Sequence, residues 1–196
     1  MDVIEQYLGE VEAAIRAISR ADVRAVVDAL YDGWVHDKTV FIIGNGGSAS
    51  TASHMMNDLT KFTSIEGRRR IRAIALTDNV PLMTAYGNDL NFESVFSEPL
   101  RTFMKRGDLL IAISGSGNSP NVISAVHVAF ELGAKVIGLC GSPGGKLAEM
   151  AQLRIIIPAA HIGQQEDGHL VVNHAMATAL RAMIASSEMH SAGWNS

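Results

Sequence analysis

Five short runs of apolar residues recur along the chain, separated by segments with helical spacing and by loops of small polar residues. These runs cover residues 39–43, 71–76, 108–113, 135–139 and 154–157. They are mostly apolar without alternation, which is typical of strands buried on both faces of a parallel sheet. We therefore predict an α/β fold, a doubly wound parallel five-stranded sheet with flavodoxin-like three-layer architecture.

Helical spacing marks the segment before the first run. Residues 2–35 carry apolar positions every three or four residues, which predicts two helices, the second capped by Asp22. Two helices are more than one layer of such a fold needs. Their apolar faces are expected to cover the sheet, to contact another subunit, or to do both.

Helical signals also appear later in the chain. Residues 119–132 open on Ser119-Pro120 and close on Gly133, and residues 166 to about 190 predict one long amphipathic helix. No linker or low-complexity tract interrupts the pattern. We predict a single domain over 1–196, with N-terminal helices in 1–36 and an α/β core with a C-terminal helix in 37–196.

Composition narrows the functional classes. The chain has 196 residues, 47% of them hydrophobic and 18% charged, with a net charge of −4, which argues against a disordered protein and a dedicated nucleic-acid binder. The single cysteine, Cys140, excludes an intrachain disulfide framework and is predicted to be a buried thiol. No signal segment opens the chain and no apolar run approaches ~18 residues, so we expect a cytoplasmic protein without a membrane or nucleic-acid partner.

The first loop with candidate chemistry is Gly44-Asn45-Gly46-Gly47-Ser48-Ala49, directly after a predicted strand. A strand, a tight glycine turn and a helix N-terminus form an anion pocket, because unpaired N–H groups and the helix dipole converge there. Further along the same helix, His54 and Asp58 stand at i and i+4 and share one face. A phosphate cradle is thus predicted close to a metal or acid/base pair.

A second loop, Ser114-Gly115-Ser116-Gly117-Asn118-Ser119-Pro120, also follows a strand and precedes a helix. Its hydroxyls and backbone N–H groups can bind a phosphate without a basic residue. The first loop also satisfies G-x-G-x-x-[GA], but the acid of a dinucleotide site is misplaced, since Glu66 precedes the next strand and Asp78 comes too late. Two such loops favour a monophosphate over a pyrophosphate.

Two further polar segments are candidates. In a predicted third loop, 86–89, Asn88 and Asp89 either bind sugar hydroxyls or terminate the preceding helix. Residues 164–174 place acids at a helix start, where they also complement the dipole, together with His169 and His174. These histidines are five residues apart and do not share a face, so one is incidental. With His54 and Asp58 they supply enough donors for a divalent-metal site.

Taken in order, the motifs at 44–49, 85–89, 114–119 and 168–174 resemble those of the phosphoheptose isomerases, which are sugar-isomerase (SIS) domain proteins. The resemblance implies a cytoplasmic homotetramer that converts sedoheptulose 7-phosphate to D-glycero-D-manno-heptose 7-phosphate for lipopolysaccharide, capsule or related heptose-containing glycans. It also implies one zinc ion, or another divalent metal, in each site at the subunit interfaces. The substrate and its phosphate are expected at Asn45, Gly46, Gly47, Ser48, Ser114, Gly115, Ser116 and Ser119, and the sugar at Asn88 and Asp89.

The resemblance places the metal at His54, Asp58, Glu166 and His174, and the catalytic groups at Asp58, Glu166 and His174. Two of these depart from the family pattern, which has glutamate where this chain has Asp58 and glutamine where it has Glu166. Asp58 shortens the reach of the carboxylate by one methylene, and Glu166 replaces a neutral ligand by an anion. Gln165 restores the amide if the loop shifts by one residue, and Asp167 shares a helix face with His174.

The function expected from the resemblance is aldose–ketose isomerisation through an enediol, with Asp58 or Glu166 as base and His174 as acid or metal-bound partner. Two alternatives stay open because of the altered acid pair. One is a non-catalytic SIS tetramer that binds a phosphosugar or a protein, as in the SIS protein that assists the bacterial replication initiator. The other is an isomerase of a different phosphosugar.

Overall fold

The computed structural model describes residues 2–187 and contains a single five-stranded sheet, in which every neighbouring pair of strands is parallel. The strands are β1 (Thr39–Gly44), β2 (Arg72–Ala75), β3 (Leu109–Ser114), β4 (Lys135–Gly141) and β5 (Leu153–Ile157). The spatial order is β2-β1-β3-β4-β5, which is the flavodoxin-like doubly wound arrangement. The fold class and the five strands are confirmed, with ends that differ from prediction by one or two residues.

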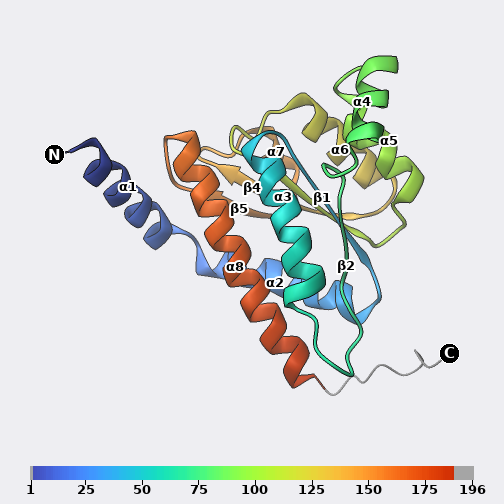
Figure 1. The fold of residues 1–196 in the computed structure, drawn as a ribbon, viewed down its shortest axis with the longest axis horizontal. Helices are drawn as coiled ribbons and strands as arrows, with labels where there is room; N and C mark the ends of the chain where they lie inside the picture. The colour runs from blue at the N-terminus through green and yellow to red at the C-terminus, as the bar shows by residue number, and fades with distance from the viewer. Residues whose placement is uncertain (1, 188–196) are drawn as a thin grey trace.

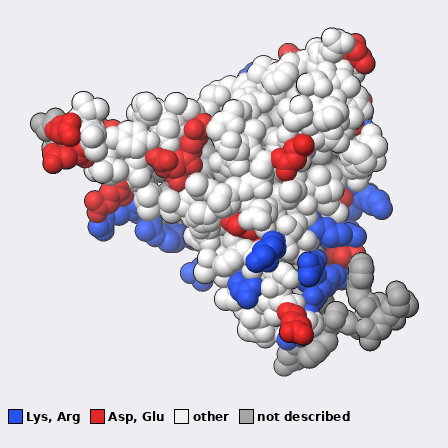
Figure 2. Space-filling view, viewed as in Figure 1, with Lys and Arg blue, Asp and Glu red and all other residues white. Residues whose placement is uncertain are grey.

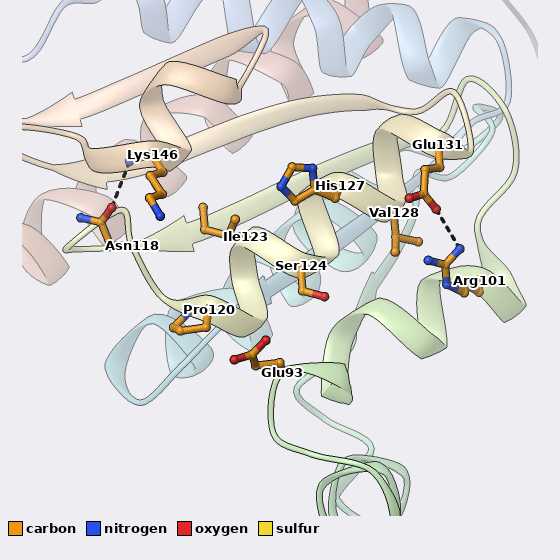
Figure 3. Close-up of a pocket in the computed structure, with 10 residues that line it drawn as sticks. All are labelled: Glu93, Arg101, Asn118, Pro120, Ile123, Ser124, His127, Val128, Glu131 and Lys146. Carbon is orange, nitrogen blue, oxygen red and sulfur yellow. Dashed lines mark hydrogen bonds and ion pairs between the residues drawn. The ribbon is translucent and has the colours of Figure 1, made fainter.

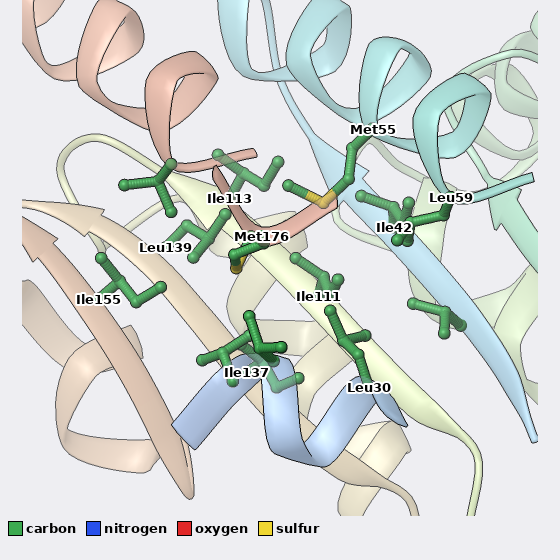
Figure 4. Packing of buried hydrophobic residues seen from close by; sticks show 14 of the residues in the cluster. Leu30, Ile42, Met55, Leu59, Ile111, Ile113, Ile137, Leu139, Ile155 and Met176 are labelled. Atoms are coloured by element: carbon green, nitrogen blue, oxygen red, sulfur yellow. The ribbon is translucent and has the colours of Figure 1, made fainter. Parts of the chain in front are cut away.

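Helices cover both faces of the sheet. On one face lie α2 (Arg20–Val35), α3 (Gly47–Asn57) and α8 (Ile162–Ser186), whose apolar side chains form one core with the strands; Figure 4 shows Leu30, Ile111 and Met176 within it. The other face carries α5 (Ser94–Phe103), α6 (Pro120–Glu131) and α7 (Gly145–Met150) around a second core. α4 (Val80–Asp89) packs on α5 and buries none of its residues.

The two N-terminal helices differ in what they cover. α2 buries Val26, Leu30 and Trp34 against the core, whereas α1 (Val3–Ala17) extends away from the sheet and buries only Ala14 (Figure 1). The predicted cap of α2 is wrong: the cap is Ser19, whose Oγ accepts a hydrogen bond of 3.2 Å from the Asp22 N–H. Asp22 already lies in the first helical turn, so its own N–H needs the cap.

Two other boundaries also differ from prediction. α8 begins at Ile162, four residues early, because the His161 ring accepts the Gly163 N–H and caps the helix. It ends at Ser186, and the predicted residues 188–190 lie outside the described part of the chain. The predicted loop at 86–89 is wrong: these residues form the last turn of α4, where the Leu90 N–H bonds to the Tyr86 carbonyl.

The predicted buried thiol of Cys140 is confirmed, and other side chains outside the site have structural roles. The arginines after residue 67 make structural contacts: Arg69 donates to the carbonyls of Trp34 and Val35 at the end of α2, and Arg72 pairs with Asp37 at 3.3 Å. Cys140 is fully buried in β4, and burial raises its pKa to about 12. Among the described helices, none combines the length and apolar character needed to cross a membrane.

Candidate active site

The order of the strands brings the two glycine-serine loops together. β1 and β3 are neighbours in the sheet, and the reversal of strand order between them creates a crevice at their carboxyl ends, where α/β proteins bind ligands. The loop after β1 opens α3, and the loop after β3 opens α6. Both predicted phosphate loops therefore lie at one topological switch point.

The first loop makes a turn that requires glycine. Gly46 has a φ of +54°, a backbone conformation that residues other than glycine adopt poorly, and it is the N-cap residue of α3. Gly47 and Ser48 open the helix, so their N–H groups have no acceptor within it and are available to an anion. Ser48 is buried, and its Cβ lies against Gly44 at the end of β1.

Asn45 is held by a residue that sequence analysis missed. Asn45 and Asn121 exchange two side-chain amide hydrogen bonds, each of 2.9 Å, which join the first loop to the start of α6. Asn121 is 2% exposed, and its Oδ1 also accepts the Val122 N–H. The paired amides therefore fix the spacing between the two loops.

Side-chain hydroxyls line the second loop. The Oγ atoms of Ser114 and Ser119 are 3.1 Å apart, and Ser116 Oγ accepts the Asn118 N–H at 3.2 Å. Gly117 has φ of +66° and lies so close to the Gly144 carbonyl that a Cβ would overlap it. The loop is thus a fixed turn with hydroxyls that can reorient toward a ligand.

The donors of this cradle are neutral. Backbone N–H groups at two helix N-termini and the serine hydroxyls supply the hydrogen bonds, and the helix dipoles supply the favourable potential. On the face drawn in Figure 2, no lysine or arginine lies over the start of α3. The arrangement suits one phosphate group at the carboxyl ends of β1 and β3.

A second cluster lies further along α3, where this helix runs beside α8 (Figure 1). The Nε2 atoms of His54 and His174 are 3.1 Å apart, although 120 residues separate them in sequence. Asp58 Oδ2 is 3.5 Å from His54 Nε2 and 3.8 Å from His174 Nε2. The imidazoles are half exposed and the carboxylate is nearly buried, so the cluster opens to solvent on the histidine side.

Asp58 occupies a special point of the backbone. It begins η1 (Asp58–Phe62), a single π-helical turn in which the Thr63 N–H bonds to the Asp58 carbonyl at 3.0 Å. Such turns are rare and occur frequently at functional sites. Its carboxylate accepts hydrogen bonds from Asn173 at 2.7 Å and from Asn57 at 3.3 Å.

The donor set fits a zinc ion. Two imidazole nitrogens and one carboxylate oxygen lie within 4.8 Å of one another. Zinc binds each such ligand at about 2.0–2.1 Å, which keeps tetrahedral ligand atoms about 3.3–3.5 Å apart. The separations of 3.1, 3.5 and 3.8 Å are close to that value. Three protein ligands and one open position are the usual pattern of catalytic zinc.

The structure separates Glu166 from this group. The metal-ligand cluster found among the described residues contains His54, Asp58 and His174 without Glu166. The Glu166 carboxyl lies against Gly47, where a Cβ added to the glycine would overlap it. Glu166 therefore faces the start of α3 and the phosphate cradle, whereas His174 lies two turns further along α8.

Gln165 and Asp167, the alternatives to Glu166, do not reach the histidine cluster either. Gln165 is buried, donates to the Ala159 carbonyl at 2.9 Å and packs against Gly115 at the second loop. Asp167 is exposed and accepts a 2.7 Å hydrogen bond from the Tyr7 hydroxyl of α1, which raises the pKa of Tyr7. Gln165 thus supports the second loop, and Asp167 ties α1 to α8.

Three other predicted residues lie outside the cluster. Asn88 and Asp89 are exposed in the last turn of α4, where Asn88 Nδ2 donates to Asp89 Oδ1 at 2.8 Å. His169 lies on the buried face of α8 and is fully buried, and burial lowers its pKa to about 4, against a smaller opposing effect of the Cys140 backbone. His169 is therefore a neutral core residue, and His174 is the histidine that reaches the cluster.

Sequence analysis also missed a polar group beside the first loop. Ser53 of α3 donates to Asp78, which follows β2, and its hydroxyl lies 3.3 Å from that of Thr77. Next to the histidine cluster is a cavity of about 230 Å³ lined by Asp58, Phe62, His174, Ala177 and Thr178. The histidine cluster therefore borders a cavity with space for a small group.

A larger cavity of about 460 Å³ lies on the outer side of α6 (Figure 3). Its lining includes His127 and Lys146, and the ion pair between Arg101 and Glu131, at 2.9 Å, lies at one end. None of the predicted site residues lines it. This cavity therefore lies apart from the predicted site residues.

Comparison with known proteins gives a consistent result. The family model described as SIS domain matches residues 6–141. The phosphoheptose isomerase of Geotalea daltonii is 39% identical over 154 residues, 79% of this chain and 80% of that protein. The phosphoheptose isomerase of Aliarcobacter butzleri is 34% identical over 180 residues, 89% of this chain and 93% of that protein. The solved phosphoheptose isomerase from Neisseria gonorrhoeae aligns with a TM-score of 0.83 at 30% identity, covering 91% of this chain and 95% of that one.

Proposed function

We propose the reaction of this chain from its family, because it belongs to the SIS domain family and, within it, to the phosphoheptose isomerases. The proposed reaction converts sedoheptulose 7-phosphate to D-glycero-D-manno-heptose 7-phosphate. The observation that carries the proposal is the juxtaposition of two features. One is a phosphate cradle of neutral donors at the starts of α3 and α6, with the Glu166 carboxyl beside it, and the other is a histidine-carboxylate cluster further along α3. A sugar phosphate can occupy both, with its phosphate in the cradle and its carbonyl end at the cluster.

The proton transfers follow from the chemistry of a ketose. After ring opening, a carboxylate removes a proton from carbon 1, the carbonyl oxygen on carbon 2 accepts a proton, and a 1,2-enediol results. A proton then returns to carbon 2 while the hydroxyl on carbon 1 loses its own, which leaves an aldehyde. We propose Asp58 as the base, with Glu166 as the alternative from its place beside Gly47. His174 acts as the acid in the metal-free site, or as the metal-bound partner when its Nε2 ligates a metal.

The phosphate cradle contributes orientation. We propose that Asn45, Gly46, Gly47, Ser48, Ser114, Gly115, Ser116 and Ser119 bind the phosphate and the adjoining part of the sugar. Binding energy gained there holds the reacting carbons in place and lowers the entropic part of the barrier. Asn88 and Asp89 remain proposed sugar contacts, although their side chains are exposed and bonded to each other on α4.

We further propose that His54, Asp58 and His174 hold one zinc ion, or another divalent metal, and that Glu166 adds a fourth ligand when its side chain turns toward them. A bound divalent cation polarises a carbonyl and stabilises enediolate oxygens. His54 and His174 present Nε2 toward a common point, and Asp58 Oδ2 completes that side of the site.

A panel of phosphorylated ketoses, including sedoheptulose 7-phosphate and its five- and six-carbon counterparts, tests the substrate. We expect sedoheptulose 7-phosphate to give the highest kcat/KM, both before and after Zn²⁺ is added to chelator-treated protein, with the higher value in the presence of Zn²⁺. If a shorter ketose phosphate gives the highest kcat/KM, the chain is an isomerase of that sugar, and the proposed seven-carbon substrate is wrong.

A second candidate is a non-catalytic SIS protein that binds a phosphosugar or a protein partner. It is favoured by the substitution of the family's glutamate by Asp58, which shortens the proposed base. Calorimetric titration with sedoheptulose 7-phosphate, followed by product analysis of the same sample, separates the two. Saturable binding without product favours the binding protein, whereas product favours the enzyme.

We also propose a cytoplasmic homotetramer with sites at the subunit interfaces. Its support is the apolar surface of the N-terminal helices: Val3, Ile4 and Leu8 of α1 are 78%, 67% and 62% exposed. A mostly apolar groove of about 640 Å³ also runs between α2 and α8. Such surfaces mark protein contacts. Light scattering after size exclusion is expected to give four times the chain mass of 20.9 kDa.

A further inference from the structure

The inner face of α8 carries an amide that the proposed function leaves unused. Asn173 is 1% exposed, and its Nδ2 donates a hydrogen bond of 2.7 Å to Asp58 Oδ2. Its neighbours Val172, Met176 and Ala177 belong to or border the apolar core. A buried amide in such surroundings is costly unless it is hydrogen-bonded. The bond to Asp58 therefore explains how this side chain is accommodated there.

The bond acts on the oxygen that faces the histidines. Asp58 Oδ2, which accepts from Asn173, is the same atom that lies 3.5 Å from His54 Nε2 and 3.8 Å from His174 Nε2. The other oxygen, Oδ1, accepts from Asn57 Nδ2 at 3.3 Å. Each oxygen of the Asp58 carboxylate therefore accepts a hydrogen bond from one amide, and the shorter of the two bonds comes from Asn173.

The position of Asn173 couples the two helices at the cluster. Asn173 is adjacent to His174 in α8, and Asp58 follows His54 by one turn at the end of α3. A hydrogen bond between Asn173 and Asp58 therefore sets the distance between α3 and α8 beside the two imidazoles. Groups that bond to a metal ligand commonly fix its orientation, and their loss typically lowers metal affinity by about 10–100-fold.

We propose that Asn173 is a positioning residue that aims the Asp58 carboxylate at the metal-binding point between His54 and His174. This inference rests on the metal site of the proposed function. It adds a residue whose amide does not contact the metal or the substrate, and which compensates for the short aspartate by fixing its direction.

The test measures Zn²⁺ affinity of chelator-treated protein by competition with a chromophoric chelator, so no sugar is needed. Asn173→Leu keeps the volume and removes the donor, and we expect the Kd for Zn²⁺ to rise about 10–100-fold. Asn173→Ser keeps a hydroxyl donor and is expected to lose less. If Asn173→Leu does not fold, Asn173→Ala takes its place with the same expected direction.

The matched control is Gln164→Leu. Gln164 is also a buried amide of α8, 3% exposed, but it donates to Glu10 of α1 and not to Asp58. Its Kd for Zn²⁺ is expected to stay within twofold of wild type. An Asn173→Leu value within twofold of wild type, or an equal loss in Gln164→Leu, would overturn the proposal.

The same measurement separates this inference from the isomerase itself. Failure of the chain to isomerise any sugar would leave the zinc affinities unchanged and the role of Asn173 intact. A wild-type protein that takes up no Zn²⁺ would overturn the metal site, and the assignment of Asn173 with it.

Discussion

His54 and His174 meet across two helices, with their Nε2 atoms 3.1 Å apart. One stands in the helix that opens at the phosphate cradle, and the other stands near the middle of the last helix. Substitution of His54 in α3 or of His174 in α8 therefore changes the same cluster. This contact makes the cluster sensitive to the relative placement of α3 and α8.

The first prediction concerns this pair. His174→Ala removes one imidazole and is expected to lower kcat/KM by at least about 100-fold, the scale of a lost general acid or metal ligand. Steady-state kinetics and zinc content are measured together. His127→Ala, which removes an exposed histidine on α6, is the control and should retain full activity. Equal activity of the two variants would exclude His174 from the chemistry.

The second prediction concerns the paired amides that join the loops. Asn121→Ala removes a buried amide and leaves the partly buried Asn45 amide without its partner, which is expected to cost about 1–3 kcal/mol in the free energy of unfolding. KM should rise because the first loop loses its support. Chemical denaturation and kinetics measure both effects, with Asn91→Ala, an exposed asparagine, as the control. Unchanged KM would show that the amide pair is only structural.

The third prediction uses two glycines in helices. Gly47→Ala places a methyl group where the Glu166 carboxyl lies, so it is expected to displace that side chain and lower kcat/KM. Gly9→Ala adds the same methyl to α1, where nothing lies within 4 Å, and should raise stability by about 0.5–1 kcal/mol. Kinetics should show the loss of kcat/KM in Gly47→Ala, and thermal unfolding should show the gain in stability in Gly9→Ala. A fully active Gly47→Ala protein would contradict it.

The fourth prediction concerns pH. His169 has a folded pKa of about 4 against the usual 6.5, so the unfolded chain binds more protons between these values. Stability therefore falls as pH drops from about 6.5 to about 4, by up to about 3 kcal/mol from this residue. His169→Leu should flatten that part of the curve. Denaturation midpoints measured from pH 4 to 7 in both proteins check it, and parallel curves would contradict the assignment.

Much of the fold could be predicted because its signals are local. The strands at 39–43 and 108–113 are mostly apolar runs, and the glycine-serine loops after them mark where each strand ends and the chain turns. Such local signals also place the loops at the carboxyl ends of the strands. The caps were less predictable, because Ser19 and Asp22 are both good capping residues and only the backbone decides between them.

The missed residues depend on long-range packing. Asn121 meets Asn45 across 76 residues and Asn173 meets Asp58 across 115, and no periodicity in the sequence marks either pair. Asn88 and Asp89 lie in the last turn of α4 and not in the predicted loop, because the backbone hydrogen bonds of α4 continue through Gly87. Glu166 depends on how α8 is rotated, which a sequence pattern does not fix to within one residue.

The isomerisation is tested most directly by proton NMR of sedoheptulose 7-phosphate incubated with the zinc-loaded protein in D₂O. A new aldoheptose signal is expected, with deuterium entering at carbon 2 because the proton passes through a carboxylate and an enediol. The signal should be lost in Asp58→Ala. No aldose signal from the wild-type protein, even at equal concentrations of enzyme and sugar, would contradict it.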